Sequence, residues 1–267
     1  MKNILVPTDF SIYAESALEY AELIAKIRNS TIHLVSVVTS SEPKDFDETE
    51  KNLIEMKNKL VSKGLLVESH VKLGHSIVEQ IINCAESINA DLILMGSHGS
   101  SSISEILIGS NTENVVSQSH LPVLTIKHSL LKSNIQKIVF ASDFSSESNR
   151  IFYTAKEFAE KFKAQIHLLK INTPSQFEPT RVSMEKINKF INNEKLSQLS
   201  GNKFKIALYS DSTEELGILN YCIEQEIDII VLGTHSKSGF WKLLQESTSQ
   251  NLVSHSFRPV LTIPIPE

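Results

Sequence analysis

Three glycines and a serine in the first half of the chain have the types and spacing of a phosphate-binding loop. Gly96 ends a short apolar run, Gly99 follows it, and nine residues separate Gly99 from Gly109 and Ser110. Glycine backbones can approach an anion closely and turn several N–H groups toward it. A helix that begins at Gly109-Ser110 would add unpaired N–H groups and the positive end of its dipole. The spacing therefore indicates a site for a phosphate group.

Two standard phosphate motifs do not describe this segment. No Gly-Lys-Ser or Gly-Lys-Thr follows the glycines, and the G-x-G-x-x-G fingerprint belongs after a first strand, whereas this segment follows a fourth. Ser110 also has a simpler interpretation, because Ser110 and Glu113 match the capping box S-x-x-E that starts a helix. For the serine alone we favour capping. For the whole strand–glycine–helix context we favour phosphate binding.

The same pattern occurs a second time in the chain. Four segments recur in the same order, which predicts two homologous domains at residues 1–128 and 136–267. The matching pairs are ILVPTDFS at 4–11 with IVFASDFS at 138–145, TIHLVSVV at 31–38 with QIHLLKIN at 165–172, DLILMGSH at 91–98 with DIIVLGTH at 228–235, and LPVLTI at 121–126 with RPVLTI at 258–263.

Short apolar runs alternate with helical patterns in the first half, and this alternation predicts the frame that positions the glycines. Such alternation implies an open parallel α/β sheet, whose ligands bind beyond the carboxyl ends of the strands. The turns after Val6, Val37 and Met95 should therefore meet, bringing Asp9 to the glycine segment. The expected strands are 4–6, 31–38, 65–72, 91–95 and 122–127, and the expected helices are 14–25, which carries a stripe of alanines, 45–62, 77–85 and 111–119.

Composition favours a globular cytoplasmic protein. Among 267 residues, 41% are hydrophobic and the formal net charge is −5, which argues against a dedicated nucleic-acid binder. Neither a signal peptide nor a membrane-spanning run is recognisable, so no membrane partner is expected. Two cysteines, Cys84 and Cys222, are interpreted as helix-packing residues in a reducing compartment.

Together these segments resemble the universal stress protein family, in its ATP-binding subgroup. The resemblance rests on ILVPTDFS, on HLVSVV, on the spacing of Gly96, Gly99, Gly109 and Ser110, and on LPVLTI. It spans the first domain, and the second follows the same outline, so the chain looks like a tandem member. The implied fold is two tandem Rossmann-like domains of the adenine nucleotide alpha hydrolase-like type, each an open five-stranded parallel sheet in the order 3-2-1-4-5.

The resemblance also implies which residues bind ATP in the first domain. At the position of Asn111 this chain departs from the family, which commonly has valine there. Mg²⁺ would bridge the phosphates if ATP were hydrolysed. Family dimers often pair through their last strands, which implies an internal pseudo-dimer of residues 122–127 and 259–263, with a homodimer left open. The implied contacts are Pro7, Thr8 and Asp9 beside the adenosine, Val37 at the adenine, Met95 and Gly96 at the ribose and phosphates, and Gly99, Gly109, Ser110 and Asn111 at the phosphates.

The second half departs from the nucleotide pattern. Asp143 and Gly233 are retained, but Ser236 stands at the position of Gly99 and Glu246 at that of Gly109. A carboxylate about 4 Å from a phosphate charge costs roughly 4 kcal/mol at an effective dielectric near 20. We therefore expect the second domain to bind ATP poorly or not at all.

Several simpler interpretations compete with these. Asp9 could cap the first helix, although Ser11 can do so equally well. His98 and His235 sit in equivalent loops, but no third ligand at suitable spacing indicates a metal site, and no metal is expected. His33 and His167 are interpreted as ordinary residues of the sheet.

The function that the sequence favours is an ATP-binding regulatory or stress-response protein. No nucleophile–base pair is recognisable, so no catalytic residue is named and enzymatic activity is left open. The alternatives are a nucleotide-free dimerisation or scaffold module and a slow ATP hydrolase.

Overall fold

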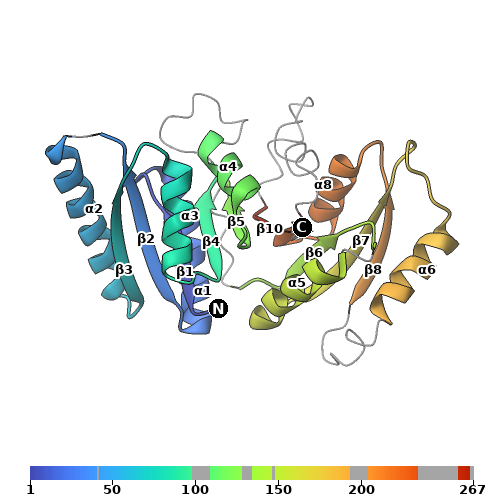
Figure 1. The fold of residues 1–267 in the computed structure, drawn as a ribbon. Coiled ribbons are helices and arrows are strands. Elements are labelled where there is room, and N and C mark those ends of the chain that lie inside the picture. The colour runs from blue at the N-terminus through green and yellow to red at the C-terminus, as the bar shows by residue number, and fades with distance from the viewer. Residues whose placement is uncertain are drawn as a thin grey trace. The chain divides into compact units, whose positions relative to one another are not determined.

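A computed structural model of the chain describes residues 1–40, 42–97, 109–127, 134–145, 148–192, 204–233 and 258–264. The backbone divides into two compact units, Met1–Ser133 and Asn134–Glu267. Figure 1 shows that strands and helices alternate along each unit, which is the pattern that the apolar runs predict.

The first unit contains a single five-stranded parallel sheet. Its strands are arranged in the order β3-β2-β1-β4-β5, which confirms the predicted order 3-2-1-4-5. The elements are β1 (Asn3–Pro7), α1 (Ile12–Arg28), β2 (Thr31–Val38), α2 (Pro43–Val61), β3 (Leu66–Leu73), α3 (Ile77–Ser87), β4 (Leu92–Gly96), α4 (Ser110–Gln118) and β5 (Val123–Ile126).

The helices of the first unit cover both faces of the sheet. Right-handed crossovers place α1 and α2 on one face and α3 and α4 on the other, and α3 lies in front of the central strands in Figure 1. Four alanines of α1, which form the predicted small-residue stripe, are buried and bring that helix close to β4. Because both faces are covered, the central strands read as uninterrupted apolar runs.

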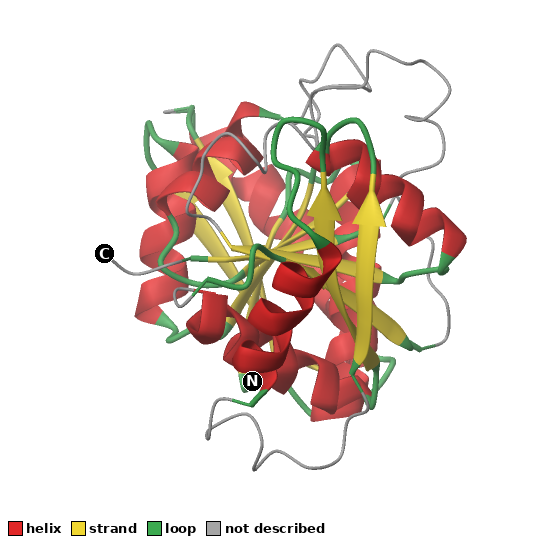
Figure 2. Ribbon diagram, turned by 90° about the vertical axis from the view of Figure 1, so that its right-hand side faces the viewer, coloured by secondary structure: helices red, strands yellow, loops and turns green. Residues whose placement is uncertain are grey.

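The second unit repeats this topology with the strand order β8-β7-β6-β9-β10. Figure 2 shows the twisted strands in yellow and the helices in red. Its elements are β6 (Lys137–Ala141), α5 (Ser148–Phe162), β7 (Gln165–Asn172), α6 (Thr180–Ile191), β8 (Lys205–Ser210), α8 (Glu214–Glu224), β9 (Ile229–Gly233) and β10 (Val260–Ile263).

Aromatic side chains distinguish the core of the second unit from that of the first. Phe140 of β6 packs against Phe144, Phe152 and Phe190, with ring centroids between 5.3 and 6.3 Å from its own. At the position of Phe140 the first unit has Val6. The two units therefore have the same topology but different core side chains. Cores tolerate such exchange when the apolar pattern and the total side-chain volume are kept.

Both cysteines are buried residues of helices, as predicted. Cys84 of α3 and Cys222 of α8 are buried free thiols, and burial raises the pKa of each. Among the helices of the described ranges, none is both long and apolar enough to cross a membrane.

Candidate functional site

The carboxyl ends of β1 and β2 meet through backbone hydrogen bonds. Pro7 is in register with Val35, and the N–H of Thr8 donates to the carbonyl of Val35 at 2.8 Å. Pro7 and Thr8 are buried, whereas Val37, two residues further along β2, is half-buried and in register with Lys72 of β3. Three of the predicted residues thus lie along neighbouring strand ends.

Asp9 belongs to a tight turn between β1 and α1. Its Oδ1 accepts the N–H of Ser11 at 3.1 Å, and the hydroxyl of Thr8 accepts the N–H of Phe10 at 3.0 Å. Phe10 has a positive φ of 63°, which is uncommon for a residue with a side chain. Ser11, not Asp9, is the N-cap of α1, because its side chain accepts the N–H of Ala14. Asp9 therefore shapes the turn rather than capping the helix.

The second unit builds the same turn with Asp143. Its Oδ1 accepts the N–H of Ser145 at 3.0 Å, and Phe144 has a φ of 60°. The recurrence of the aspartate therefore reflects a shared role in the backbone turn.

Asp143 is also held by side chains of its own unit. The hydroxyl of Ser148 donates to its Oδ1 at 3.1 Å. Burial opposes ionisation of Asp143, but the hydrogen bonds from Ser145 and Ser148 and the positive charge of Lys170 outweigh it and lower the pKa. At the repeat positions of Ser148 and Lys170 the first unit has Ala14 and Ser36. The aspartates of the two units thus have different surroundings.

Two hydrogen bonds fasten the start of α4 to the end of β4. The N–H of Gly109 donates to the carbonyl of Ser97 at 2.8 Å, and the hydroxyl of Thr112 donates to the carbonyl of Gly96 at 2.9 Å. Thr112 is buried, so this bond is shielded from water. Gly96 and Gly109, which are far apart in sequence, are thereby brought together at the carboxyl end of β4.

The helix α4 begins differently from the capping box that the sequence favours. Gly109 is the N-cap and Ser110 is the first helical residue, so the pairing of Ser110 with Glu113 as a capping box is wrong. Side chains of Ser11, Ser76 and Thr213 cap α1, α3 and α8, whereas α4, like α2 and α6, has no side-chain cap among the described residues. The first-turn N–H groups of α4 thus have no side-chain cap, and Ser110 and Asn111 beside them are exposed.

Gly96 is required by packing against α1. A Cβ on Gly96 would lie 2.6 Å from the carbonyl oxygen of Tyr13 and 2.7 Å from its carbonyl carbon. Since these are backbone atoms, rotation of a side chain cannot relieve the contact. The glycine spacing predicts close approach by a ligand at Gly96, whereas a side chain there would point at the first turn of α1.

We therefore expect Gly96→Ala to lower the free energy of unfolding by about 1–3 kcal/mol, the usual cost of overpacking. Chemical denaturation measures the change. Gly74→Ala is the matched control, because the three atoms nearest its new Cβ belong to the flexible side chain of Gln80, the first of them at 2.8 Å. Equal losses in the two variants would contradict the packing role of Gly96.

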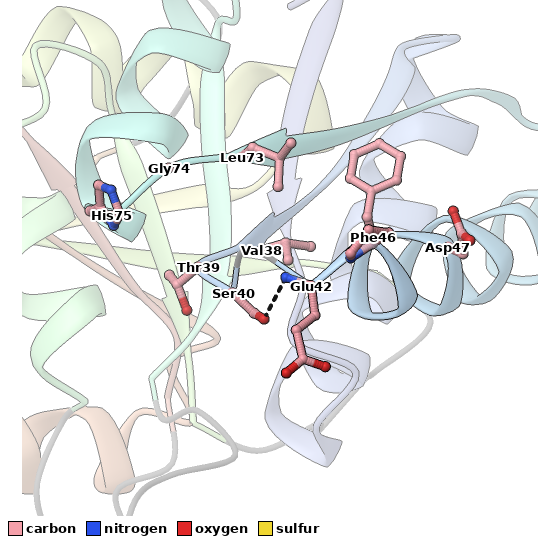
Figure 3. A pocket seen from close by; sticks show the side chains of 10 residues that line it. Val38, Thr39, Ser40, Glu42, Phe46, Asp47, Leu73, Gly74 and His75 are labelled. Atoms are coloured by element: carbon pink, nitrogen blue, oxygen red, sulfur yellow. Dashed lines mark hydrogen bonds between the residues drawn. The ribbon is translucent and has the colours of Figure 1, made fainter.

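A pocket that the sequence did not reveal opens at the ends of β2 and β3. Its volume is about 620 Å³, and Figure 3 shows the apolar side chains of Val38, Phe46 and Leu73 together with the polar ends of Thr39 and Glu42. Val38 directly follows Val37, so the pocket adjoins the strand end assigned to the adenine. The only signal for it in the sequence is the general rule that parallel strands collect ligands at their carboxyl ends.

Some predicted residues fall outside the described ranges. These are Gly99 and His98 in the first unit, and His235, Ser236 and Glu246 in the second. Within the described ranges, Met95 and Gly96 are buried at the end of β4. Ser97 and Thr112 were missed by the sequence argument, although a threonine in the first turn after a Gly-Ser pair could have suggested a tether.

Comparison with known proteins assigns both halves to one group. A sequence model described as the universal stress protein family matches residues 1–127 and again residues 134–264. Universal stress protein MJ0577 of Methanocaldococcus jannaschii is 35% identical over 153 residues, covering 47% of this chain and 94% of that protein. Universal stress protein Slr1230 of Synechocystis is 23% identical over 294 residues, covering 98% and 99%.

A solved structure has the same fold over nearly the whole length. The universal stress protein from Archaeoglobus fulgidus superposes with a TM-score of 0.74 at 24% identity, covering 99% of this chain and 97% of that one. At this identity the likeness extends to the fold alone.

Proposed function

The chain belongs to the universal stress protein family, and from this premise we propose that it is an ATP-binding regulatory protein with one working nucleotide site, in its first domain. Bound ATP changes the conformation of the domain or its choice of partner. The observation that carries the proposal is the N-terminus of α4, which is tethered beside β4 and lacks a side-chain cap.

The chemistry of this helix start suits a phosphate. Its first-turn N–H groups, which no described side chain caps, and its dipole favour an anion, and the exposed hydroxyl of Ser110 adds a donor. Gly109, as the N-cap, places no side chain between the helix and the ligand. Residues 98–108, which include Gly99, complete the loop in sequence.

The neighbouring strand ends suit the nucleoside. In the proposed arrangement Pro7, Thr8 and Asp9 lie at the adenosine, Val37 meets the adenine, and Met95 and Gly96 border the ribose. Support comes from the parallel pairing of β1 with both β2 and β4, which gathers these residues at one edge. The pocket lined by Val38 and Leu73 adds apolar space at that edge.

Differences in the second domain support one site rather than two. Ser148 and Lys170 act on Asp143 where the first unit has Ala14 and Ser36, and Glu246 replaces the glycine that caps α4. A carboxylate at that position repels phosphate.

Isothermal titration of the full chain with ATP, with and without Mg²⁺, tests the proposal. We expect about one ATP per chain. Two equal sites would overturn the asymmetry between the domains. If native mass spectrometry finds no nucleotide bound to the purified protein, and none binds when it is added, the proposal is wrong. The nucleotide-free dimerisation or scaffold module would then be favoured.

Phosphate release measured in the same samples separates a regulator from a hydrolase. We expect ATP to remain largely intact, because no general base is identified in the sequence. Rapid release that disappears in Gly109→Glu would establish hydrolysis at this site. The internal pairing of residues 122–127 with residues 259–263, and a homodimer of the chain, both stay predictions.

A further inference from the structure

Three potential metal ligands gather on one face of the strand pair β2–β3, apart from the proposed nucleotide contacts. His33 of β2 is in register with Glu68 of β3, and Val35 is in register with His70. Residues in register on parallel strands project to the same face, and so do residues two positions apart on one strand. His33, Glu68 and His70 therefore share a face.

The distances between their donor atoms match a metal centre. Nδ1 of His33 lies 3.1 Å from Nε2 of His70 and 3.4 Å from a carboxylate oxygen of Glu68. One donor atom from each residue lies within 4.8 Å of the other two. Two ligands that are each about 2.0–2.1 Å from a tetrahedral zinc ion lie about 3.3 Å from one another. The observed separations thus require little rearrangement to accept zinc.

Both imidazoles are prepared to act as ligands. His33 Nδ1 and His70 Nε2 are at hydrogen-bond distance, so in the metal-free protein one of them carries the shared proton, which moves to the other nitrogen of its ring when zinc binds. The Nε2 atom of His33 is buried and has no hydrogen-bond partner within the described ranges. Metal binding at Nδ1 puts the proton of the His33 ring on this Nε2, and a ligand histidine usually donates that N–H to a partner, so a bound water is expected beside it.

The ligand atoms select the kind of metal. Lys72 and Lys57 lie near His70, and their positive charge opposes every divalent cation alike, so the preference comes from the nitrogen and oxygen donors. Imidazole nitrogen binds zinc and other transition metals in preference to Mg²⁺ or Ca²⁺. Glu68 is exposed, so the site opens to solvent and leaves a fourth position for water.

The second domain shows that this strand pair does not need such a cluster to fold. His167 occupies the position of His33, but its register partner is Lys205, and Ala207 stands where His70 does. The ring nitrogens of His167 contact Tyr221 Oη at 2.9 Å and Gln165 Oε1 at 3.1 Å. The equivalent histidine is thus an ordinary hydrogen-bonded core residue, whereas His33 faces two further ligands.

We infer that His33, Glu68 and His70 form a binding site for a divalent transition metal, with zinc as the best match and water as the fourth ligand. The bound metal links the edge strand β3 to β2. Metal binding should not depend on bound nucleotide, since none of the three residues belongs to the proposed ATP contacts.

Zinc titration of the full chain, first stripped with a chelator, tests the site. We expect one high-affinity zinc ion, a rise in the melting temperature on binding, and a tetrahedral absorption spectrum when Co²⁺ replaces zinc. Glu68→Gln and His70→Gln should each weaken zinc binding by about 100-fold or more, since the loss of even an outer-shell partner costs 10–100-fold.

His120→Gln is the control, because it removes an exposed histidine elsewhere, beyond the end of α4. It should keep the wild-type affinity for zinc. Wild-type protein that binds no zinc at micromolar concentration would overturn the proposal. So would unchanged binding in folded Glu68→Gln and His70→Gln, or an equal loss in His120→Gln. The variant Glu68→Gln keeps the test valid if His70→Gln fails to fold, because Glu68 is exposed.

Discussion

Replacing Gly109 by glutamate is expected to weaken ATP binding by about 1,000-fold. Gly109 is the N-cap of α4, so the new carboxylate would stand where the phosphates are proposed to bind. Two like charges about 4 Å apart cost roughly 4 kcal/mol at an effective dielectric near 20, and each 1.4 kcal/mol is a factor of about ten in affinity. Isothermal titration with ATP measures the loss.

The fold should tolerate this substitution. The backbone of Gly109 has φ −63° and ψ 137°, which any residue can adopt. A carboxylate near a helix N-terminus is itself favourable, so the free energy of unfolding should stay level or rise slightly. Loss of binding without loss of stability is therefore the signature of the proposed site.

Gly109→Gln separates charge from bulk. Glutamine has nearly the size of glutamate but no charge, so we expect a much smaller loss of ATP affinity. Raising the salt concentration should narrow the difference between the two variants, because salt screens exposed charges. Equal losses in Gly109→Glu and Gly109→Gln would show that bulk alone blocks the site, and no loss in either would remove Gly109 from it.

Acidification should destabilise the protein through His167, by about 3 kcal/mol. His167 is buried, and desolvation, helped by the positive charges of Lys205 and Lys137, lowers its pKa from 6.5 to about 4. The unfolded chain binds a proton more readily than the folded one. The contribution is therefore fully present above about pH 6.5 and is lost as the pH falls toward about 4. A difference of about 2.5 units at about 1.36 kcal/mol each gives this magnitude.

Denaturation curves measured across this pH range, with His167→Gln beside wild type, test the effect. The substitution also removes packing contacts, so a comparison of the two proteins at a single pH does not isolate the titration. The readout is the slope of the free energy of unfolding against pH. We expect a flatter slope in His167→Gln and a wild-type slope in the control His120→Gln. His33 and His70 also have lowered pKa values, so their protonation also destabilises the fold as the pH falls. Part of the slope therefore remains in His167→Gln. An unchanged slope in His167→Gln would contradict the assignment.

Much of the fold follows from the sequence because its signals are local. The short apolar runs at Ile4–Val6 and Leu92–Met95 are typical of covered parallel strands, and the alanines of α1 mark the helix face that meets the sheet. The repeat then predicts that the second half has the same topology, and the structure has it.

The candidate site was less predictable, because its details depend on which backbones meet. Ser110 matches a capping box in sequence, but the bond from Gly109 to Ser97 sets the start of α4 at Gly109. Asp9 has the residue type of a cap, but the positive φ of Phe10 leaves Ser11 in the capping position. Gly96 resembles a ligand-facing glycine, but Tyr13 lies where its side chain would be.

By itself the sequence determined that the chain has two related α/β domains and that their glycine patterns differ. Those properties reside in the order and spacing of residues along the chain. Only the tertiary structure decided that Gly96 and Gly109 share one strand end, and that His33 faces Glu68 and His70 whereas His167 does not. The reason is that parallel strands are joined by long crossover connections, so residues that face one another, such as His33 and Glu68, lie far apart in sequence and meet only in the folded chain.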